Sequence, residues 1–346
     1  MSRNYSASLA LPILISLIVS MAYQPDISAA PFEDGLALYN TGDYLAAQKV
    51  WRPIAEQGDA EAQNYIGLLY EEGLGVPQDY GVAMKWYRKA ADRRDAAAQN
   101  SVGVLYAKGR GVSQDDVAAM KWYRKAAAQG YVYAQNSVGV YYYEGRGVAK
   151  DDAIAMAWFR KAADQGYVEA QNNVGYLYKS GQGAARDDAK AMKWFRKAAE
   201  QGHAQAQHDV GVLYLNGTGV QQSFTEAAIW TRRAAKQGHT LAEYNMGLMN
   251  AEGSGVPQNY SKAKKWYYKA AIKNYTDAQV NLGIMYAEGQ GMKKDLTMAY
   301  VWFSKAVEQG DTEAKEYLRK VQKSMTPIQI GGAMQLAREW KVVPLR

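Results

Sequence analysis

The chain has no cysteine and few histidines. Among its 346 residues the lack of cysteine excludes disulfides, thiolate metal ligands and a thiol nucleophile. Only His203, His208 and His239 are present, and the first and last are 36 residues apart, which places them at equivalent turns of a repeat rather than in a metal set. We find no motif of a serine, histidine and acid triad, although sequence order alone leaves a triad open. We therefore expect no metal, no cofactor and no catalytic residues.

A strong charge of one sign is also missing. The formal net charge of +7 arises from 41 basic and 34 acidic residues, which is too balanced to indicate a polyanion partner by itself. Wholesale disorder is excluded because 48% of the residues are apolar.

Long apolar runs are absent apart from residues 9–19, "LALPILISLIV", which follow the positive charge of Arg3. This run is too short to span a bilayer stably and reads as the core of an export signal. We predict a signal peptide over residues 1–22 with cleavage after Ala22. Cleavage after Ala29 and an uncleaved anchor are the alternatives. An exported chain without thiols suits an oxidising compartment, so we expect a periplasmic or secreted bacterial protein.

What the sequence does contain is a repeat. Seven glycines and seven tryptophans each recur every 36 residues: Gly67, Gly103, Gly139, Gly175, Gly211, Gly247, Gly283 and Trp86, Trp122, Trp158, Trp194, Trp230, Trp266, Trp302. We predict a linker over 23–31, a shortened repeat over 32–59, seven full repeats over 60–310 and capping helices over 311–346. The last region would hold one helix over 312–322 and another over 325–341.

Each repeat is predicted to be a helix hairpin. Ala62, Ile66 and Leu69 follow one helical face, and Ala83, Trp86, Tyr87 and Ala90 follow another. Between them "EGLGVPQD" (72–79) supplies a glycine-rich turn and Asp79 as an N-cap, and a Gln-Gly turn closes most repeats. Two aromatic side chains cannot offset the entropy of ordering 36 residues, so stability must come from stacking.

The stretch "AQNYIGLLYEEGLGVPQDYGVAMKWYRKAA" (62–91) and its successors resemble the Sel1-like repeat family. The resemblance covers residues 32–323 and implies an all-α, right-handed α-solenoid related to tetratricopeptide repeats, whose members bind other proteins. Three departures are local: Asn250 replaces a helix-one tyrosine, Thr231 replaces the aromatic after Trp230, and "RRD" (93–95) replaces the Gln-Gly turn.

The recurring "KWYRK" cluster is predicted to be structural. On a helical wheel Trp86 and Tyr87 face the core, while Lys85, Arg88 and Lys89 fall on the opposite, solvated side. Nucleic-acid binding would need exposed stacking aromatics, so we expect none. The "GxG" loops lack a phosphate-binding fingerprint, and pairs such as Asp115-Asp116 lack the spacing of a calcium loop and are predicted helix caps.

A candidate recognition surface follows from comparing the repeats. Positions equivalent to 64, 68 and 71 vary between repeats while lying on one stripe of the first helix, opposite Ala62. The family resemblance implies that first helices line the concave face of the superhelix. The alternative is that these are ordinary packing residues. The predicted partner-binding residues are Asn136, Tyr143, Asn172, Tyr176, Lys179, His208, Leu215 and Tyr244.

The sequence thus favours a non-enzymatic scaffold of the cell envelope that binds a protein or peptide, with no nucleic-acid partner and no stable membrane span after signal cleavage. We expect a monomer. One alternative is a hydrolase, because some cysteine-rich secreted relatives are linked to β-lactam hydrolysis. Another is an envelope factor that binds peptidoglycan or an anionic glycopolymer through basic columns on the second helices.

Overall fold

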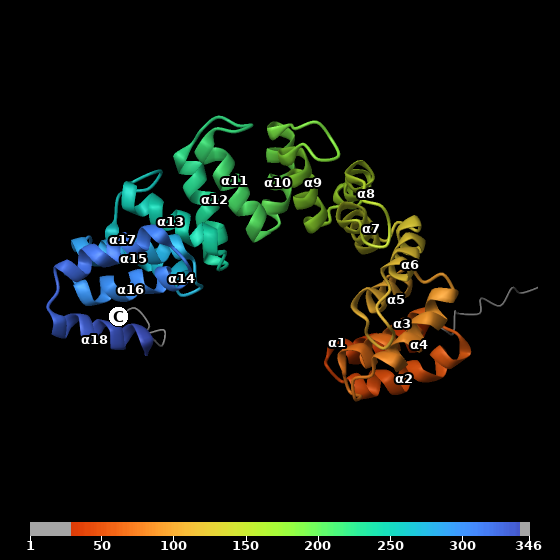
Figure 1. The fold of residues 1–346 in the computed structure, drawn as a ribbon. Helices are drawn as coiled ribbons and strands as arrows, with labels where there is room; N and C mark the ends of the chain where they lie inside the picture. Colours follow the sequence, from red (N-terminus) through yellow and green to blue (C-terminus); the bar gives the residue numbers. More distant parts are fainter. Residues whose placement is uncertain (1–28, 340–346) are drawn as a thin grey trace, which may run out of the picture. The chain divides into compact units, whose positions relative to one another are not determined.

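The computed structural model describes residues 29–339, and this part of the chain is built of helices without strands. The helices follow one another as hairpins (Figure 1). Their bounds are α1 Ala29–Asn40, α2 Tyr44–Gln57, α3 Ala60–Glu72, α4 Tyr80–Asp92, α5 Ala96–Lys108, α6 Asp116–Ala128, α7 Val132–Glu144, α8 Asp152–Asp164, α9 Val168–Ser180, α10 Asp188–Glu200, α11 Ala204–Asn216, α12 Phe224–Lys236, α13 Thr240–Glu252, α14 Tyr260–Ala271, α15 Thr276–Glu288, α16 Leu296–Glu308, α17 Thr312–Lys323 and α18 Pro327–Arg338.

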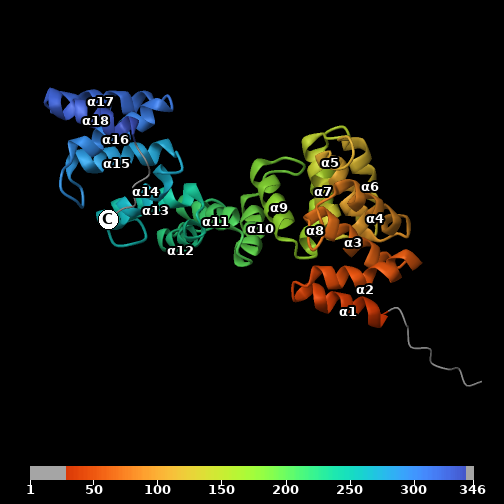
Figure 2. The ribbon, with the colours of Figure 1, turned by 90° about the horizontal axis from the view of Figure 1, so that it is seen from below.

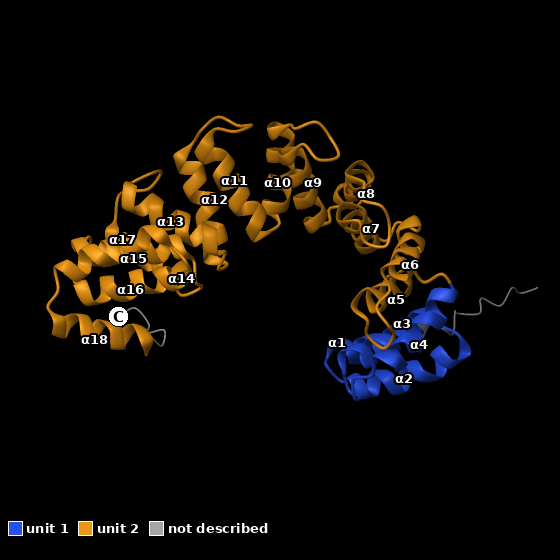
Figure 3. Cartoon of the chain, viewed as in Figure 1, with its two compact units in different colours: residues 1–93 blue, residues 94–346 orange. Residues whose placement is uncertain are grey.

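The chain divides into two compact units, residues 1–93 and 94–346, hereafter unit 1 and unit 2 (Figure 3). The predicted signal peptide, residues 1–22, and its cleavage site after Ala22 lie outside the described residues. No helix within residues 29–339 is long and apolar enough to cross a bilayer.

Unit 1 packs α1 to α4 in chain order. Its core surrounds the fully buried Trp51, whose indole N–H donates to the carbonyl of Phe32 at 3.1 Å. Gly35 lies directly against the same indole, because a β-carbon there would overlap the ring. The shortened first hairpin is therefore organised around its own tryptophan.

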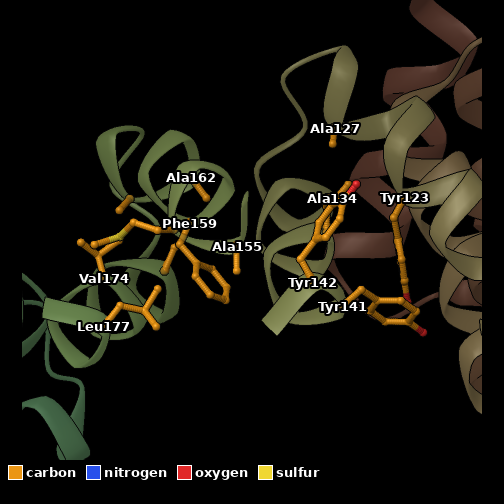
Figure 4. Packing of buried hydrophobic residues seen from close by; sticks show 14 of the residues in the cluster. Tyr123, Ala127, Ala134, Tyr141, Tyr142, Ala155, Phe159, Ala162, Val174 and Leu177 are labelled. Atoms are coloured by element: carbon orange, nitrogen blue, oxygen red, sulfur yellow. The ribbon is translucent and has the colours of Figure 1, made fainter. Parts of the chain in front are cut away.

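Unit 2 stacks its helices in the same way from α5 to α17, and α18 packs on α16 (Figure 2). Each second helix contacts both its own first helix and the first helix of the next hairpin. One continuous cluster of buried side chains runs from Ala119 on α6 to Trp194 on α10, and Figure 4 shows part of it. The stacked, all-α solenoid expected from the repeat is confirmed.

Capping residues define where the helices begin. The Oδ1 atoms of Asp115, Asp151 and Asp187 accept hydrogen bonds from backbone amides at 2.8–2.9 Å at the starts of α6, α8 and α10. Asp116, the second acid of its pair, accepts from Arg146 at 2.8 Å in the loop of the next repeat. The acidic pairs thus cap helices, as predicted, and Asp116 also links successive hairpins.

The recurring glycine of the first helix permits close packing inside each hairpin. A β-carbon at Gly139 would lie 2.6 Å from the Phe159 ring, and one at Gly67 would lie 2.6 Å from the Tyr87 ring. The ring belongs to the second helix of the same hairpin, so this glycine brings the two helices of one repeat together.

The tryptophans are less uniformly buried than predicted. Trp122, Trp194, Trp230 and Trp302 are buried, but Trp86, Trp158 and Trp266 are only partly so. The next aromatic along is deeper, since Tyr87 and Phe159 expose only 1% and 2% of their surface. The core position in the seven repeats is therefore the residue that follows the tryptophan, which is aromatic in every repeat except the one with Thr231.

The basic residues of the second helices also need a correction. Lys85, Arg88 and Lys89 are exposed as predicted, but Lys89 does not point away from the aromatic face. Its Nζ lies 4.2 Å from the Trp86 ring centroid, and Lys125 lies 3.8 Å from that of Trp122. The reason is that residues three apart on a helix are neighbours, so the lysine Nζ lies over the indole ring in a cation–π contact.

A candidate binding stripe on the first helices

The structure places all eight predicted partner-binding residues on four consecutive first helices, α7, α9, α11 and α13. Tyr176 is the most open of them, with 50% of its surface exposed, and His208 is buried at 8%. The other six are half-buried: Asn136, Tyr143, Asn172, Lys179, Leu215 and Tyr244. We call this set the first-helix stripe. Its burial fits both a packing role and a recognition role.

Hydrogen bonds connect the stripe from one repeat to the next. Asn173 donates from Nδ2 to Oδ1 of Asn136 at 3.2 Å. Two further bonds join residues with the same separation: Asn245 Nδ2 lies 3.2 Å from His208 Nε2, and Asn281 Nδ2 lies 3.5 Å from the Tyr244 hydroxyl. The donors Asn173, Asn245 and Asn281 were not predicted from the sequence. The available signal was that each stands one position after the stripe position of its own repeat, 37 residues after its acceptor.

The equivalent hydrogen bond is missing at Asn172. The residue in the donor position is Asp209, whose ionised carboxylate can only accept hydrogen bonds. Asp209 is held instead by Lys179, whose Nζ lies 3.2 Å from Oδ1, and by Gln205 at 2.9 Å. The buried Oδ1 of Asn172 is left without a partner among the described residues. The bond is made at Asn136, His208 and Tyr244, whereas the equivalent Asn64 and Asn100 also leave a buried Oδ1 without a partner among the described residues.

Tyr143 and Tyr176 are brought together across the gap between α7 and α9. Both line a slot of about 180 Å³ whose floor is Phe159. The Tyr143 hydroxyl donates to Oε1 of Gln182 at 3.2 Å, and Lys150 Nζ lies 5.1 Å from the Tyr143 ring centroid. Burial and the neighbouring Tyr176 raise the pKa of Tyr143, so the Tyr143 side chain remains a neutral hydroxyl group at physiological pH.

The three histidines lie near one another but do not form a metal site. His203 and His239 are the N-caps of α11 and α13, as equivalent positions should be, and each accepts a backbone amide through Nδ1 at 3.1 and 3.2 Å. The His239 ring stacks on His208 at 4.8 Å. Within residues 29–339 no group of three or more histidine, aspartate or glutamate side chains could hold a metal ion.

Burial shifts these histidines towards their neutral forms. It lowers the pKa of His208 to about 4, with the nearby His239 adding to the effect, and it lowers the pKa of His203 and His239 as well. A neutral Nδ1 is what an N-cap histidine needs, because a protonated ring cannot accept the backbone amide.

Taken together, the described chain is a stack of helix hairpins with a polar and aromatic stripe along its first helices, the organisation of a repeat scaffold. The Sel1 repeat model matches residues 60–95, 96–131, 132–167, 168–203, 204–239, 240–275 and 276–311. These matches cover more than half of the chain, and the protein belongs to the Sel1 repeat family. Proteins of this family are typically non-catalytic scaffolds for protein interactions.

A solved structure agrees with this assignment. The chain is similar to a Sel1 repeat protein from Oxalobacter formigenes, with 33% identity and a TM-score of 0.64 over 70% of this chain and 97% of that one. It is also similar to a protective antigen with an SLR fold from uropathogenic Escherichia coli, with 28% identity and a TM-score of 0.46 over 90% and 83% of the two chains. A search of curated proteins finds no match.

Proposed function

We propose that this protein is an exported, non-enzymatic scaffold of the bacterial envelope that captures a protein or peptide along the first-helix stripe. The observation that carries the proposal is the variation of the stripe from one repeat to the next. Buried core positions repeat with little change, whereas the stripe joins repeats through two asparagines at Asn136 and through an ion pair at Lys179 and Asp209. The exposed Tyr176 lies on the same helix as Lys179. Tyrosine and tryptophan dominate binding energy at protein interfaces.

The test is a crosslinking pull-down from the native envelope fraction, with the wild-type chain and a Tyr143→Ala/Tyr176→Ala variant as baits. We expect the variant to lose capture while its helicity and melting temperature stay unchanged. Tyr133→Ala is the matched control, because Tyr133 is 51% exposed on α7 but lies outside the stripe. Capture that survives the double change would reject this surface.

The export part of the proposal has its own test. Residues 1–22 should be missing from the mature protein, so N-terminal sequencing of the envelope fraction should begin at Tyr23, or at Ala30 for the alternative cleavage. A hydrolase remains the enzymatic alternative, and turnover of nitrocefin by the purified protein would support it.

One observation favours a second candidate, binding of an anionic envelope polymer. Lysines at one equivalent position of four second helices are all exposed: Lys85, Lys121, Lys193 and Lys265. Against this, nearby cations are engaged, since Arg196 pairs with Glu200 at 2.9 Å. Co-sedimentation with peptidoglycan sacculi that weakens with salt would support the polymer, because such attraction is screened by ions.

A further inference from the structure

Two separate hollows of unit 2 are the same structural feature. The first is the slot of about 180 Å³ between α7 and α9, and the second is a slot of about 290 Å³ between α15 and α17. All seven residues lining the first have counterparts 144 residues later, four repeats on, in the lining of the second. Among these pairs are Val140 and Ile284, Phe159 and Phe303, and Leu177 and Val321.

Both slots have an apolar floor and a rim that carries charges of both signs. Phe159 and Phe303 form the floors and are 2% and 1% exposed. Glu144 stands at the first rim and Glu288 at the second, and both are exposed. Lys294 lines the second slot, and its counterpart Lys150 lies above Tyr143 in the first.

The intervening hairpins lack one or another part of this arrangement. Between α9 and α11, Lys179 replaces Tyr143; its Nζ lies 5.9 Å from the Phe195 floor and bonds to Asp209. Between α11 and α13 the floor is Thr231 rather than an aromatic ring. Between α13 and α15 the Tyr244 ring lies 5.8 Å from its floor, Tyr267. Across the gaps from α7 to α17, an open slot over a phenylalanine therefore depends on local residues and is not a general consequence of the repeat.

The size and chemistry of the slots define what they can hold. Their volumes lie below the ~300–1,000 Å³ of sites for drug-sized ligands, so each has room for about one side chain. The aromatic floor favours an apolar group, and the rim of mixed charge gives no preference for a polyanion. Small pockets that take single apolar anchors are typical of the centres of protein interfaces.

We propose that the α7/α9 and α15/α17 slots are anchor sites, each taking one apolar side chain of a polypeptide partner. The inference rests on the proposed function and specifies the partner as a chain with two separated apolar anchors. Engaging both slots at once raises the overall affinity above that of either slot, because the second anchor binds within the same complex.

The test uses N-acetyl-L-phenylalaninamide as the probe and the full mature chain labelled at its valine, leucine and isoleucine methyl groups. On titration, NMR shifts should concentrate at Val140 and Leu177 for one slot and at Ile284 and Val321 for the other. N-acetylglycinamide, which has no side chain, should produce neither set. Shifts spread over the surface, or equal shifts with the glycine probe, would overturn the proposal.

Slot-filling variants assign the two sites separately. Val140→Phe should weaken the probe affinity of the first slot at least tenfold and leave the second unchanged, and Ile284→Phe should do the reverse. Val212→Phe is the matched control. Val212 holds the equivalent position on α11, beside the gap between α9 and α11 where Lys179 covers Phe195. If Val140→Phe or Ile284→Phe lowers the melting temperature, Val140→Glu or Ile284→Glu is used instead and places a charge at the same half-buried position.

The outcomes separate this inference from the proposed function. Loss of capture by the Tyr143→Ala/Tyr176→Ala variant together with no probe binding at either slot would reject the anchors and keep the scaffold. Probe binding at both slots, with capture unaffected by that variant, would keep the apolar slots and reject the stripe as the capture surface.

Discussion

The Nζ of Lys273 lies 2.8 Å from Oε2 of Glu243, a carboxylate whose side chain is only 4% exposed. In the neighbouring repeats the equivalent residues are two glutamines, as where Gln237 donates to Gln207 at 2.8 Å. The two substitutions are therefore coupled: a buried acid in one helix is matched by a cation one repeat boundary away. An ion pair has replaced an amide pair at an unchanged place in the stack.

This coupling predicts the result of single and double substitutions. Lys273→Gln should destabilise the protein by about 2 kcal/mol, because Glu243 loses its charged donor in a buried position. Glu243→Gln/Lys273→Gln should recover most of that loss by recreating the amide pair seen in other repeats. Thermal and urea unfolding of the full chain measure both, and a double variant no more stable than Lys273→Gln would contradict the coupling.

Arg94 adopts a backbone conformation that arginine disfavours. Its φ of +67° is in the left-handed region, where Gly130, Gly166 and Gly202 serve the equivalent turns. Arg94→Gly should therefore raise the free energy of unfolding by about 1 kcal/mol. Asn274, at φ +63°, is the internal comparison, and Asn274→Gly should give a smaller gain because asparagine tolerates this region. Equal losses of melting temperature in both variants would refute this account.

Gly139→Ala should destabilise the protein by about 1–3 kcal/mol, although alanine is the better helix former. The added methyl group would meet the Phe159 ring at 2.6 Å, so the two helices of the hairpin would have to separate. Differential scanning calorimetry measures the change. Gly331→Ala on α18 is the control, because nothing lies within 4 Å of a β-carbon there and the helix should be unharmed.

Stability should fall in mild acid around α11 and α13. His208 is neutral in the fold with a pKa of about 4, below its ordinary value of 6.5. Its contribution is therefore complete above pH 6.5 and is lost as the pH falls from 6.5 towards 4. The loss at pH 5 is about 2 kcal/mol for this residue. His203 and His239, whose pKa values are also lowered, act in the same direction through their N-caps.

The charged groups around His208 and His239 do not reverse the lowering of their pKa values. Asp209 favours protonation of His208, while Lys179 and the ring of His239 oppose it, and burial is the largest effect. Around His239, Asp209 and Glu243 favour protonation, and Lys273 and His203 oppose it. His208→Asn keeps a side chain able to bond Asn245 and removes the titration. Melting temperatures at pH 7.5 and 5 should differ less in this variant than in the wild type, and an unchanged difference would exclude His208 as the cause.

Local patterns in the sequence were enough to predict the hairpins. The 36-residue spacing, the capping aspartates and the apolar faces each depend on contacts within one repeat. Two features were out of reach because they depend on how repeats meet. The donor of the Asn136 bond comes from Asn173 in the next repeat, and the slots need residues from three helices. The contact of Lys89 with Trp86 is local to one helix, and it was missed because a helical wheel shows the direction of a side chain at its base and not the reach of a long lysine. Whether the stripe binds a partner is a property of the partner as much as of the chain.

The most direct measurement of that binding is photocrosslinking from a single position in the native envelope. A photoreactive phenylalanine analogue placed at Tyr176 should form a discrete adduct with a captured protein. The same analogue at Tyr133, which is equally exposed, should form none. Adducts of the same kind and yield from both positions, or from neither, would contradict capture along the first-helix stripe.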